Sequence, residues 1–211
     1  MDSKPKHPTW FFYTAWIVLS ALATPLALAI TFAVLSLIID QIGGIIFVNG
    51  QQQTTEDYLF LFIFVPLFCL LTSFLQYILL RRYLPKMGWW MVATGLGWLS
   101  VWIVMQTIDF FGSVFLSNLE LILVFPLIGT LIGFFQWLLL RRRITQAAWW
   151  ILASALGWGL AALGTYTPLK NGSILAQLFL FGLSPAIITG FAWWFLWKQQ
   201  PQTPEEQAAI S

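Results

Sequence analysis

Charge is scarce in this sequence: only 9% of its 211 residues are Asp, Glu, Lys or Arg, whereas 59% are hydrophobic. Because soluble domains carry about 25% charged residues, this composition excludes an ordinary soluble globular protein. Charge-free stretches long enough for the ~20 apolar residues of a membrane-spanning helix recur along the chain. Their hydrophobicity does not alternate, which favours helices over a barrel. The composition therefore indicates a helical integral membrane protein.

Residues that carry metal and nucleophilic chemistry are also scarce. The chain has one cysteine, Cys69, and one histidine, His7. These numbers exclude a disulfide within the chain, a cysteine-ligated metal, a bis-histidine haem and an H-E-x-x-H zinc site. No P-loop, G-x-G-x-x-G or G-x-S-x-G motif occurs in the required context. We therefore expect no enzyme activity, no catalytic residue, no metal site and no cofactor.

Six stretches are apolar enough to span a bilayer: 8–39, 58–80, 87–108, 121–140, 144–169 and 171–197. The segments between them differ sharply in Lys and Arg. Nine of the ten cations fall on one side of the predicted membrane: Lys4, Lys6, Arg81, Arg82, Lys86, Arg141, Arg142, Arg143 and Lys198. The positive-inside rule places that side, and with it both termini, in the cytoplasm.

The chain also contains an internal repeat. Residues 126–158, "PLIGTLIGFFQWLLLRRRITQAAWWILASALGW", align without gaps with residues 66–98, "PLFCLLTSFLQYILLRRYLPKMGWWMVATGLGW". More faintly, 16–23 resembles 150–157, and 190–198 resembles 133–141. The repeating unit is thus a helical hairpin.

The predicted fold is all-α, with six transmembrane helices arranged as three repeated αα-hairpins. The hairpins cover about 10–82, 87–143 and 147–198, between a cytoplasmic segment 1–9 and a cytoplasmic tail 199–211. Because each unit has two spans, all copies share one orientation, which predicts a pseudo-threefold axis along the membrane normal.

Small residues recur at four-residue spacing in the predicted spans. Such spacing lets helices approach closely in lipid, so we favour helix packing over the lining of a pore. The residues concerned are Ser73, Gly97, Gly129, Gly133, Gly157, Gly182, Ala186 and Gly190.

Gln76 and Gln136 are the prominent polar residues within the spans. Each precedes an arginine by five residues, about 7 Å along a helix, and so lies at shallow depth on the cytoplasmic half. The favoured interpretation is a hydrogen bond between helices. The alternatives are a polar cavity, or ligation of a pigment's magnesium by the amide oxygen. The third hairpin has Trp193 at this position, which argues against a symmetric three-residue site.

Most tryptophans are predicted to lie near the cytoplasmic boundary, where indole rings form an aromatic belt at headgroup depth. These are Trp10, Trp89, Trp90, Trp137, Trp149, Trp150, Trp194 and Trp197. Trp98, Trp102 and Trp158 lie deeper, as core residues or as the wall of an apolar pocket.

Two arginine clusters follow the second and fourth spans. Juxtamembrane cations attract anionic lipids by about 1 kcal/mol each. The residues that could contact lipid headgroups are Arg81, Arg82, Arg141, Arg142 and Arg143.

The repeated "Q-[YW]-x-L-L-R-R…WW…A-x-x-x-G-W" signature resembles multi-pass membrane proteins of cyanobacteria and Chloroflexota-type bacteria. The resemblance covers residues 66–158 well and the rest loosely. It implies only a bacterial cytoplasmic membrane, or the thylakoid membrane in a cyanobacterium, and carries over no catalytic residue.

Two classes of function remain open. The first is a non-enzymatic scaffold, assembly factor or accessory subunit that acts through helix and lipid contacts. The second is a small transporter or channel along the pseudo-threefold axis, with a pigment- or lipid-binding protein between the two. Expected partners are membrane lipids, other membrane proteins or a second copy of the chain, and no nucleic acid.

Overall fold

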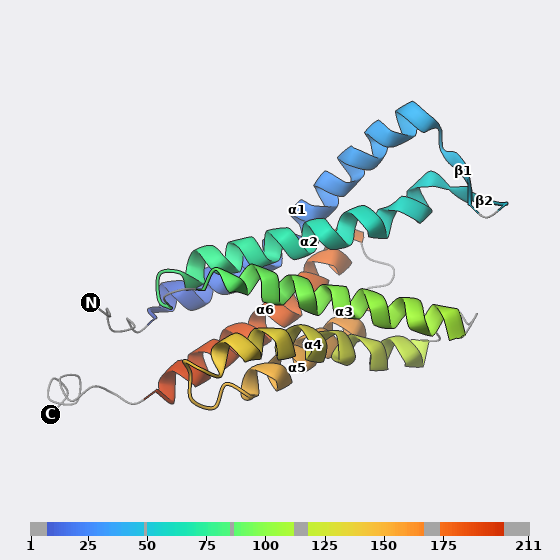
Figure 1. The fold of residues 1–211 in the computed structure, drawn as a ribbon. Helices are drawn as coiled ribbons and strands as arrows, with labels where there is room; N and C mark the ends of the chain where they lie inside the picture. The colour runs from blue at the N-terminus through green and yellow to red at the C-terminus, as the bar shows by residue number, and fades with distance from the viewer. Residues whose placement is uncertain (1–7, 49, 85–86, 112–117, 167–173, 201–211) are drawn as a thin grey trace, which may run out of the picture.

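A computed structural model describes residues 8–48, 50–84, 87–111, 118–166 and 174–200. Within these residues the chain forms six α-helices and one β-hairpin (Figure 1). The helices are α1 (Trp10–Ile42), α2 (Thr55–Leu80), α3 (Trp89–Phe111), α4 (Asn118–Leu140), α5 (Trp149–Tyr166) and α6 (Ile174–Lys198). Most of the predicted N-terminal segment and tail, together with Lys4, Lys6 and Lys86, lie outside the described residues.

Three helical stretches of the described chain are long and apolar enough to cross a membrane. They are Trp10–Ile42 and Tyr58–Leu80, each with a mean hydropathy of 2.4, and Leu123–Leu140, with 2.0. Two shorter apolar helices, Trp89–Val104 and Trp149–Ala162, accompany them. The predicted helical character is therefore confirmed, and three helices have the length and composition that a membrane span requires.

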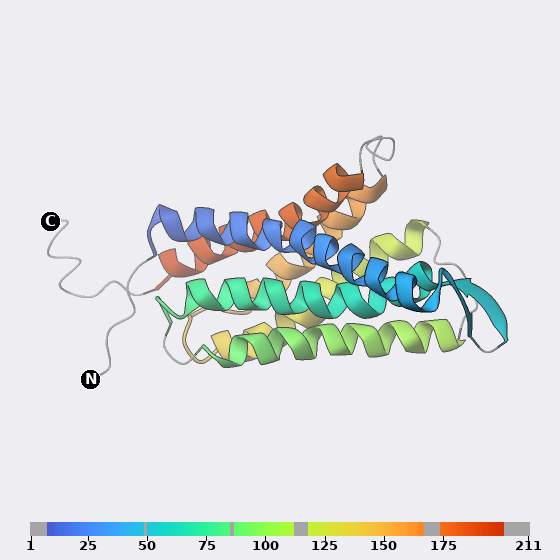
Figure 2. The same cartoon turned by 90° about the horizontal axis from the view of Figure 1, so that it is seen from above.

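The six helices form a closed ring. Each helix packs against the next one in sequence, and α6 packs against α1, as Figures 1 and 2 also show. The α2–α3 contact is the sparsest of the six. We call the contacts between successive predicted hairpins, α2–α3, α4–α5 and α6–α1, the three seams.

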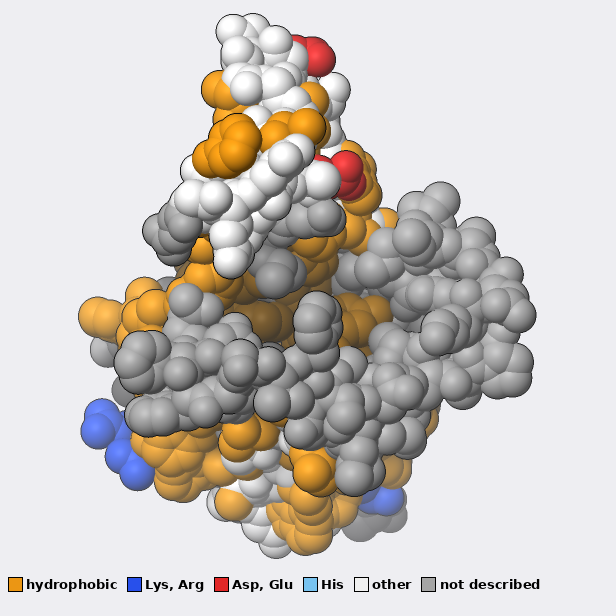
Figure 3. Space-filling model, turned by 90° about the vertical axis from the view of Figure 1, so that its right-hand side faces the viewer, with side chains coloured by type: hydrophobic (Ala, Val, Ile, Leu, Met, Phe, Trp, Pro, Cys, Tyr) orange, Lys and Arg blue, Asp and Glu red, His pale blue; other side chains and the backbone are white. Residues whose placement is uncertain are grey.

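All described cations lie at one end of the ring. The α2–α3 and α4–α5 connections turn at the end where α1 begins and α6 ends (Figure 1). Arg81, Arg82, Arg141–Arg143 and Lys198 are exposed there. We call this the cationic end. Figure 3 shows the opposite end, where acidic side chains are visible on the projecting part of the molecule.

The first long connection corrects the all-α prediction, because it contains a two-stranded sheet. Strand β1 (Ile45–Val48) pairs antiparallel with β2 (Gln51–Thr54), with Ile45 opposite Thr54 and Val48 opposite Gln51. The pair Asn49-Gly50 between them is a strong sequence signal for a tight hairpin turn, and Gly50 has φ +79°. A search for stretches long enough to span a bilayer does not detect strands of four residues, so the all-α prediction is wrong at this point.

Candidate functional site

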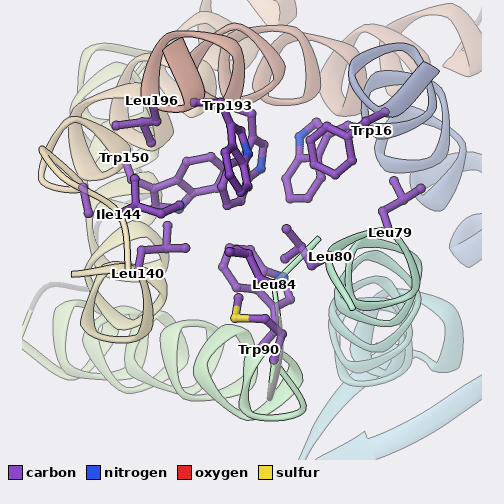
Figure 4. Packing of buried hydrophobic residues seen from close by; sticks show 14 residues of the cluster. Trp16, Leu79, Leu80, Leu84, Trp90, Leu140, Ile144, Trp150, Trp193 and Leu196 are labelled. Atoms are coloured by element: carbon purple, nitrogen blue, oxygen red, sulfur yellow. The ribbon is translucent and has the colours of Figure 1, made fainter. Parts of the chain in front are cut away.

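Four tryptophans from four helices meet near the cationic end of the ring. We call Trp16, Trp90, Trp150 and Trp193 the indole cluster. Their ring centroids are 4.9–6.4 Å apart in all six pairs, and each side chain is at most 1% exposed. Figure 4 shows them pointing toward the axis of the ring. Edge-to-face pairs predominate, the arrangement that the quadrupoles of aromatic rings favour.

The indole cluster corrects part of the predicted aromatic belt. Trp89 and Trp149 are 67% and 51% exposed, as headgroup residues should be, but Trp90 and Trp150 are 0% and 1% exposed. A step of one residue turns a helix by about 100°, so the second tryptophan of each "WW" pair faces the core. Trp197 is likewise only 4% exposed.

The two glutamines explain how indoles can be buried here. Gln76 Oε1 accepts a hydrogen bond from Trp90 Nε1 at 3.0 Å, and Gln76 Nε2 donates to Ser20 Oγ at 3.2 Å. Gln76, on α2, thus joins α1 to α3. Because a buried indole N–H without a partner costs about 1–3 kcal/mol, this acceptor makes the buried position tolerable.

Gln136 repeats the arrangement one hairpin later. Gln136 Oε1 accepts from Trp150 Nε1 at 2.8 Å, and its Nε2 donates to Thr94 Oγ1 at 2.9 Å. Gln136, on α4, thus joins α3 to α5. Both glutamines are at least 92% buried, and both amide oxygens accept an indole N–H. The sequence carried a signal for this pairing, since glutamine and tryptophan are 14 residues apart in both copies.

The third seam closes differently. Trp193 stands at the glutamine position, and Trp16 Nε1 instead donates to Thr189 Oγ1 at 3.0 Å. Thr189 lies about one turn before Trp193 on α6, and its hydroxyl donates a hydrogen bond to the Pro185 carbonyl at 2.6 Å. The buried Nε1 of Trp193 has no hydrogen-bond partner among the described residues. A hydroxyl thus replaces the amide at this seam, while Trp193 fills the axis.

A small polar chamber lies on the axis beside the indole cluster. Its volume is about 50 Å³, and Thr72, Gln76, Thr94, Gln136 and Ser154 provide much of its polar lining. A buried water needs at least ~10–15 Å³, so a few waters fit, and the buried Thr72 Oγ1 without a protein partner is a group that they would bond.

Aromatic rings bound the chamber on both sides. Trp150 of the indole cluster lines one side, and Phe68, Trp98 and Trp158 line the other. The centroids of these last three rings are 5.3–6.2 Å apart. Gln76 and Gln136 therefore line a small chamber that lies between two groups of aromatic rings.

The predicted packing glycines lie at helix contacts inside the ring. A Cβ on Gly97 would come within 2.7 Å of Ile132 Cα, and one on Gly157 within 2.7 Å of Pro185 Cα, both inside predicted hairpins. A Cβ on Gly129 would collide with the Ser154 carbonyl, and one on Gly133 would lie 2.8 Å from Ser154 Cβ.

The same holds at the α6–α1 seam. A Cβ on Gly182 would collide with Thr24 Oγ1, and one on Gly190 would lie 2.9 Å from Ile17 Cγ1. Ala186 is 2% exposed in the same helix. The glycines are therefore used within the chain, so they are not a free face for another protein.

Ser73 is the exception among the small residues, because it lines a groove although it is only 1% exposed. Together with Phe62, Cys69, Gly95, Trp98 and Trp102, it lines a groove of about 500 Å³ between α2 and α3. Trp102 thus forms the wall of an apolar pocket, one of its two predicted roles, whereas Trp158 belongs to the core and Trp98 contributes to both.

Comparison with protein families, curated proteins and solved structures finds no match for this chain.

Proposed function

We propose that this chain is a six-span, non-enzymatic accessory or assembly protein of a bacterial membrane, with both termini cytoplasmic. In this proposal the three hairpins form a pseudo-threefold bundle whose centre gives structural stability. Its surface binds another membrane protein. The exposed cations at one end of the ring support the orientation, since cytoplasmic ends of spans are enriched in Lys and Arg.

The packed centre argues against the transporter alternative. A channel along the axis needs a continuous water-filled path, whereas packed aromatic rings lie on both sides of the chamber of about 50 Å³. The glutamine oxygens, which a pigment's magnesium would require, accept hydrogen bonds from indole N–H groups instead. The polar residues of the centre are thus explained by the stability of the bundle.

The observation that carries the accessory role is a projecting arm. We define the arm as the end of α1 from Leu37, together with β1 and β2; Figure 1 shows it extending away from the other helices. Since α1 has 33 residues, it is about 50 Å long and exceeds the ~30 Å hydrocarbon core.

The arm bears large apolar side chains beyond the length that the hydrocarbon core requires. Leu37 is 67% exposed, Ile42 56% and Phe47 74%. Apolar side chains grouped at an interface with water mark a binding surface. The occupant that fits is a second membrane protein that presents apolar side chains at the outer face of the bilayer.

The test compares binding and flux in the same preparation. Gentle-detergent purification from the source membranes should yield one stoichiometric partner, identified by mass spectrometry, whose recovery falls at least roughly tenfold in Phe47→Ser with Leu37→Ser. The double variant Leu152→Ser with Leu156→Ser, on the exposed face of α5 outside the arm, is the matched control and should keep the partner.

Purified protein in liposomes should conduct K⁺, Na⁺ and Cl⁻ no faster than empty vesicles. Ion flux that Gln136→Leu abolishes, or a partner that survives the double arm variant, would refute the accessory role.

A further inference from the structure

The α2–α3 seam is open where the other two seams are closed. At the α4–α5 seam Gly129 and Gly133 let α4 approach the backbone of α5 around Ser154. Cys69 and Ser73 occupy the corresponding positions of α2, 60 residues earlier. Both side chains line the groove of about 500 Å³ that lies between α2 and α3.

The groove is apolar and open to the side. The Ser73 hydroxyl donates a hydrogen bond to the Leu70 carbonyl of its own helix at 3.1 Å, so it does not donate one into the groove. Phe62 and Leu99 at the borders are 50% and 53% exposed, and a Cβ on Gly95 would meet nothing within 4 Å. In a bilayer such a space is filled, because an empty groove loses the dispersion contacts of its walls.

The dimensions of the groove fit a hydrocarbon chain better than a helix. An α-helix with its side chains is ~10–12 Å across, whereas 500 Å³ lies within the ~300–1,000 Å³ of small-ligand pockets. From Ser73 to Phe62 the groove runs for 11 residues of α2, about 16 Å. That length is close to half of the ~30 Å hydrocarbon core, the depth of one leaflet.

The cations at the end of α2 have the charge to bind the headgroup of such a lipid. Arg81 and Arg82 follow α2 and are exposed at the cationic end. Arg81 comes eight residues after Ser73, so the groove begins about 12 Å along the helix from these cations. The side chains of Asp40 and Glu56 lie at the other end of the helices, flanking the β-hairpin.

We propose that the α2–α3 groove binds one acyl chain of an anionic phospholipid of the cytoplasmic leaflet, with the phosphate held by Arg81 and Arg82. This inference rests on the orientation in the proposed function but not on the partner of the arm. The lipid would fill the seam that the chain's own side chains leave open.

The experiment measures lipids retained by the full-length protein in native mass spectrometry. The delipidated protein is incubated with equal amounts of phosphatidylglycerol and phosphatidylcholine that have identical acyl chains. The wild-type protein should retain one phosphatidylglycerol, in roughly tenfold preference over phosphatidylcholine. Gly95→Leu should fill the groove and lose both lipids, whereas Leu96→Phe, which adds bulk on the exposed face beside it, should keep them.

A matched pair of charge variants tests the headgroup site independently of folding. Arg81→Gln with Arg82→Gln should retain a lipid but lose the preference for phosphatidylglycerol. Arg141→Gln with Arg142→Gln, the same change at the closed α4–α5 seam, should behave as wild type.

Three outcomes would overturn the inference: equal losses in the two arginine pairs, undiminished lipid in a monodisperse Gly95→Leu protein, or a polypeptide bound at the groove instead of a lipid. Flux measured in the same protein would refute the proposed function while leaving the lipid result intact.

Discussion

The α4–α5 and α2–α3 seams share a repeated sequence but differ in packing. At α4–α5, Gly129 and Gly133 allow backbone contact along the seam. At α2–α3, the glutamine–indole bond is kept, but Cys69 and Ser73 replace the glycines and a groove remains. The comparison teaches that two seams with related sequences can differ in closure where two glycines are replaced by residues with two more heavy atoms each.

Enlarging the small residue at the closed seam should have the largest effect. Gly129→Leu places a side chain against the Ser154 carbonyl, backbone that cannot give way, so we expect no folded protein. Cys69→Leu at the corresponding position borders the groove and should fold with less than about 1.5 kcal/mol lost. Size-exclusion chromatography and thermal unfolding in detergent would measure both. Similar stability of the two variants would show that the seams do not differ.

Removal of each glutamine amide should have an intermediate effect and separate the two seams. Gln136→Leu leaves the buried Trp150 N–H unpaired, which costs about 1–3 kcal/mol, but the glycine contacts hold α4 on α5.

Gln76→Leu removes the hydrogen bond between Gln76 and Trp90 that joins α2 to α3. Because this seam is sparsely packed, the two helices should also move apart. Spin labels on the exposed faces of α2 and α3 should move apart in Gln76→Leu, whereas labels on α4 and α5 should not move in Gln136→Leu. Equal displacements would contradict this account of the seams.

The smallest effect is expected at the third seam. Trp150→Phe loses a bonded indole N–H and strands the Gln136 oxygen, whereas Trp193→Phe removes a buried N–H that has no partner. Both changes remove the same side-chain atoms. The two variants should therefore differ in their free energy of unfolding by the value of the hydrogen bond, about 1 kcal/mol. Chemical denaturation should therefore rank Trp193→Phe as the milder variant. The reverse order would mean that packing at Trp193 outweighs the bond at Trp150.

The sequence predicted the helices better than the sites. The long apolar stretches of the sequence located all six helices within a few residues, except that α5 starts at Trp149 rather than at residue 144. The spacing of Gln76 and Gln136 pointed to interhelical bonds but not to indole partners, because the "WW" pairs were assigned together to the membrane boundary. Exposed tryptophan side chains prefer the headgroup region of a bilayer. The second tryptophan of each pair is buried instead, because a glutamine oxygen on another helix accepts the hydrogen bond of its indole N–H.

The sequence by itself determined that the chain is apolar and helical, that it carries its cations at alternate connections and that its middle is repeated. These properties follow from composition and local periodicity. Only the tertiary structure decided which tryptophans are buried, that the glycines are used within the ring and that α2–α3 stays open. Those outcomes depend on which surfaces meet across the ring, where a hydrogen-bond acceptor or a single side chain at the contact changes the result.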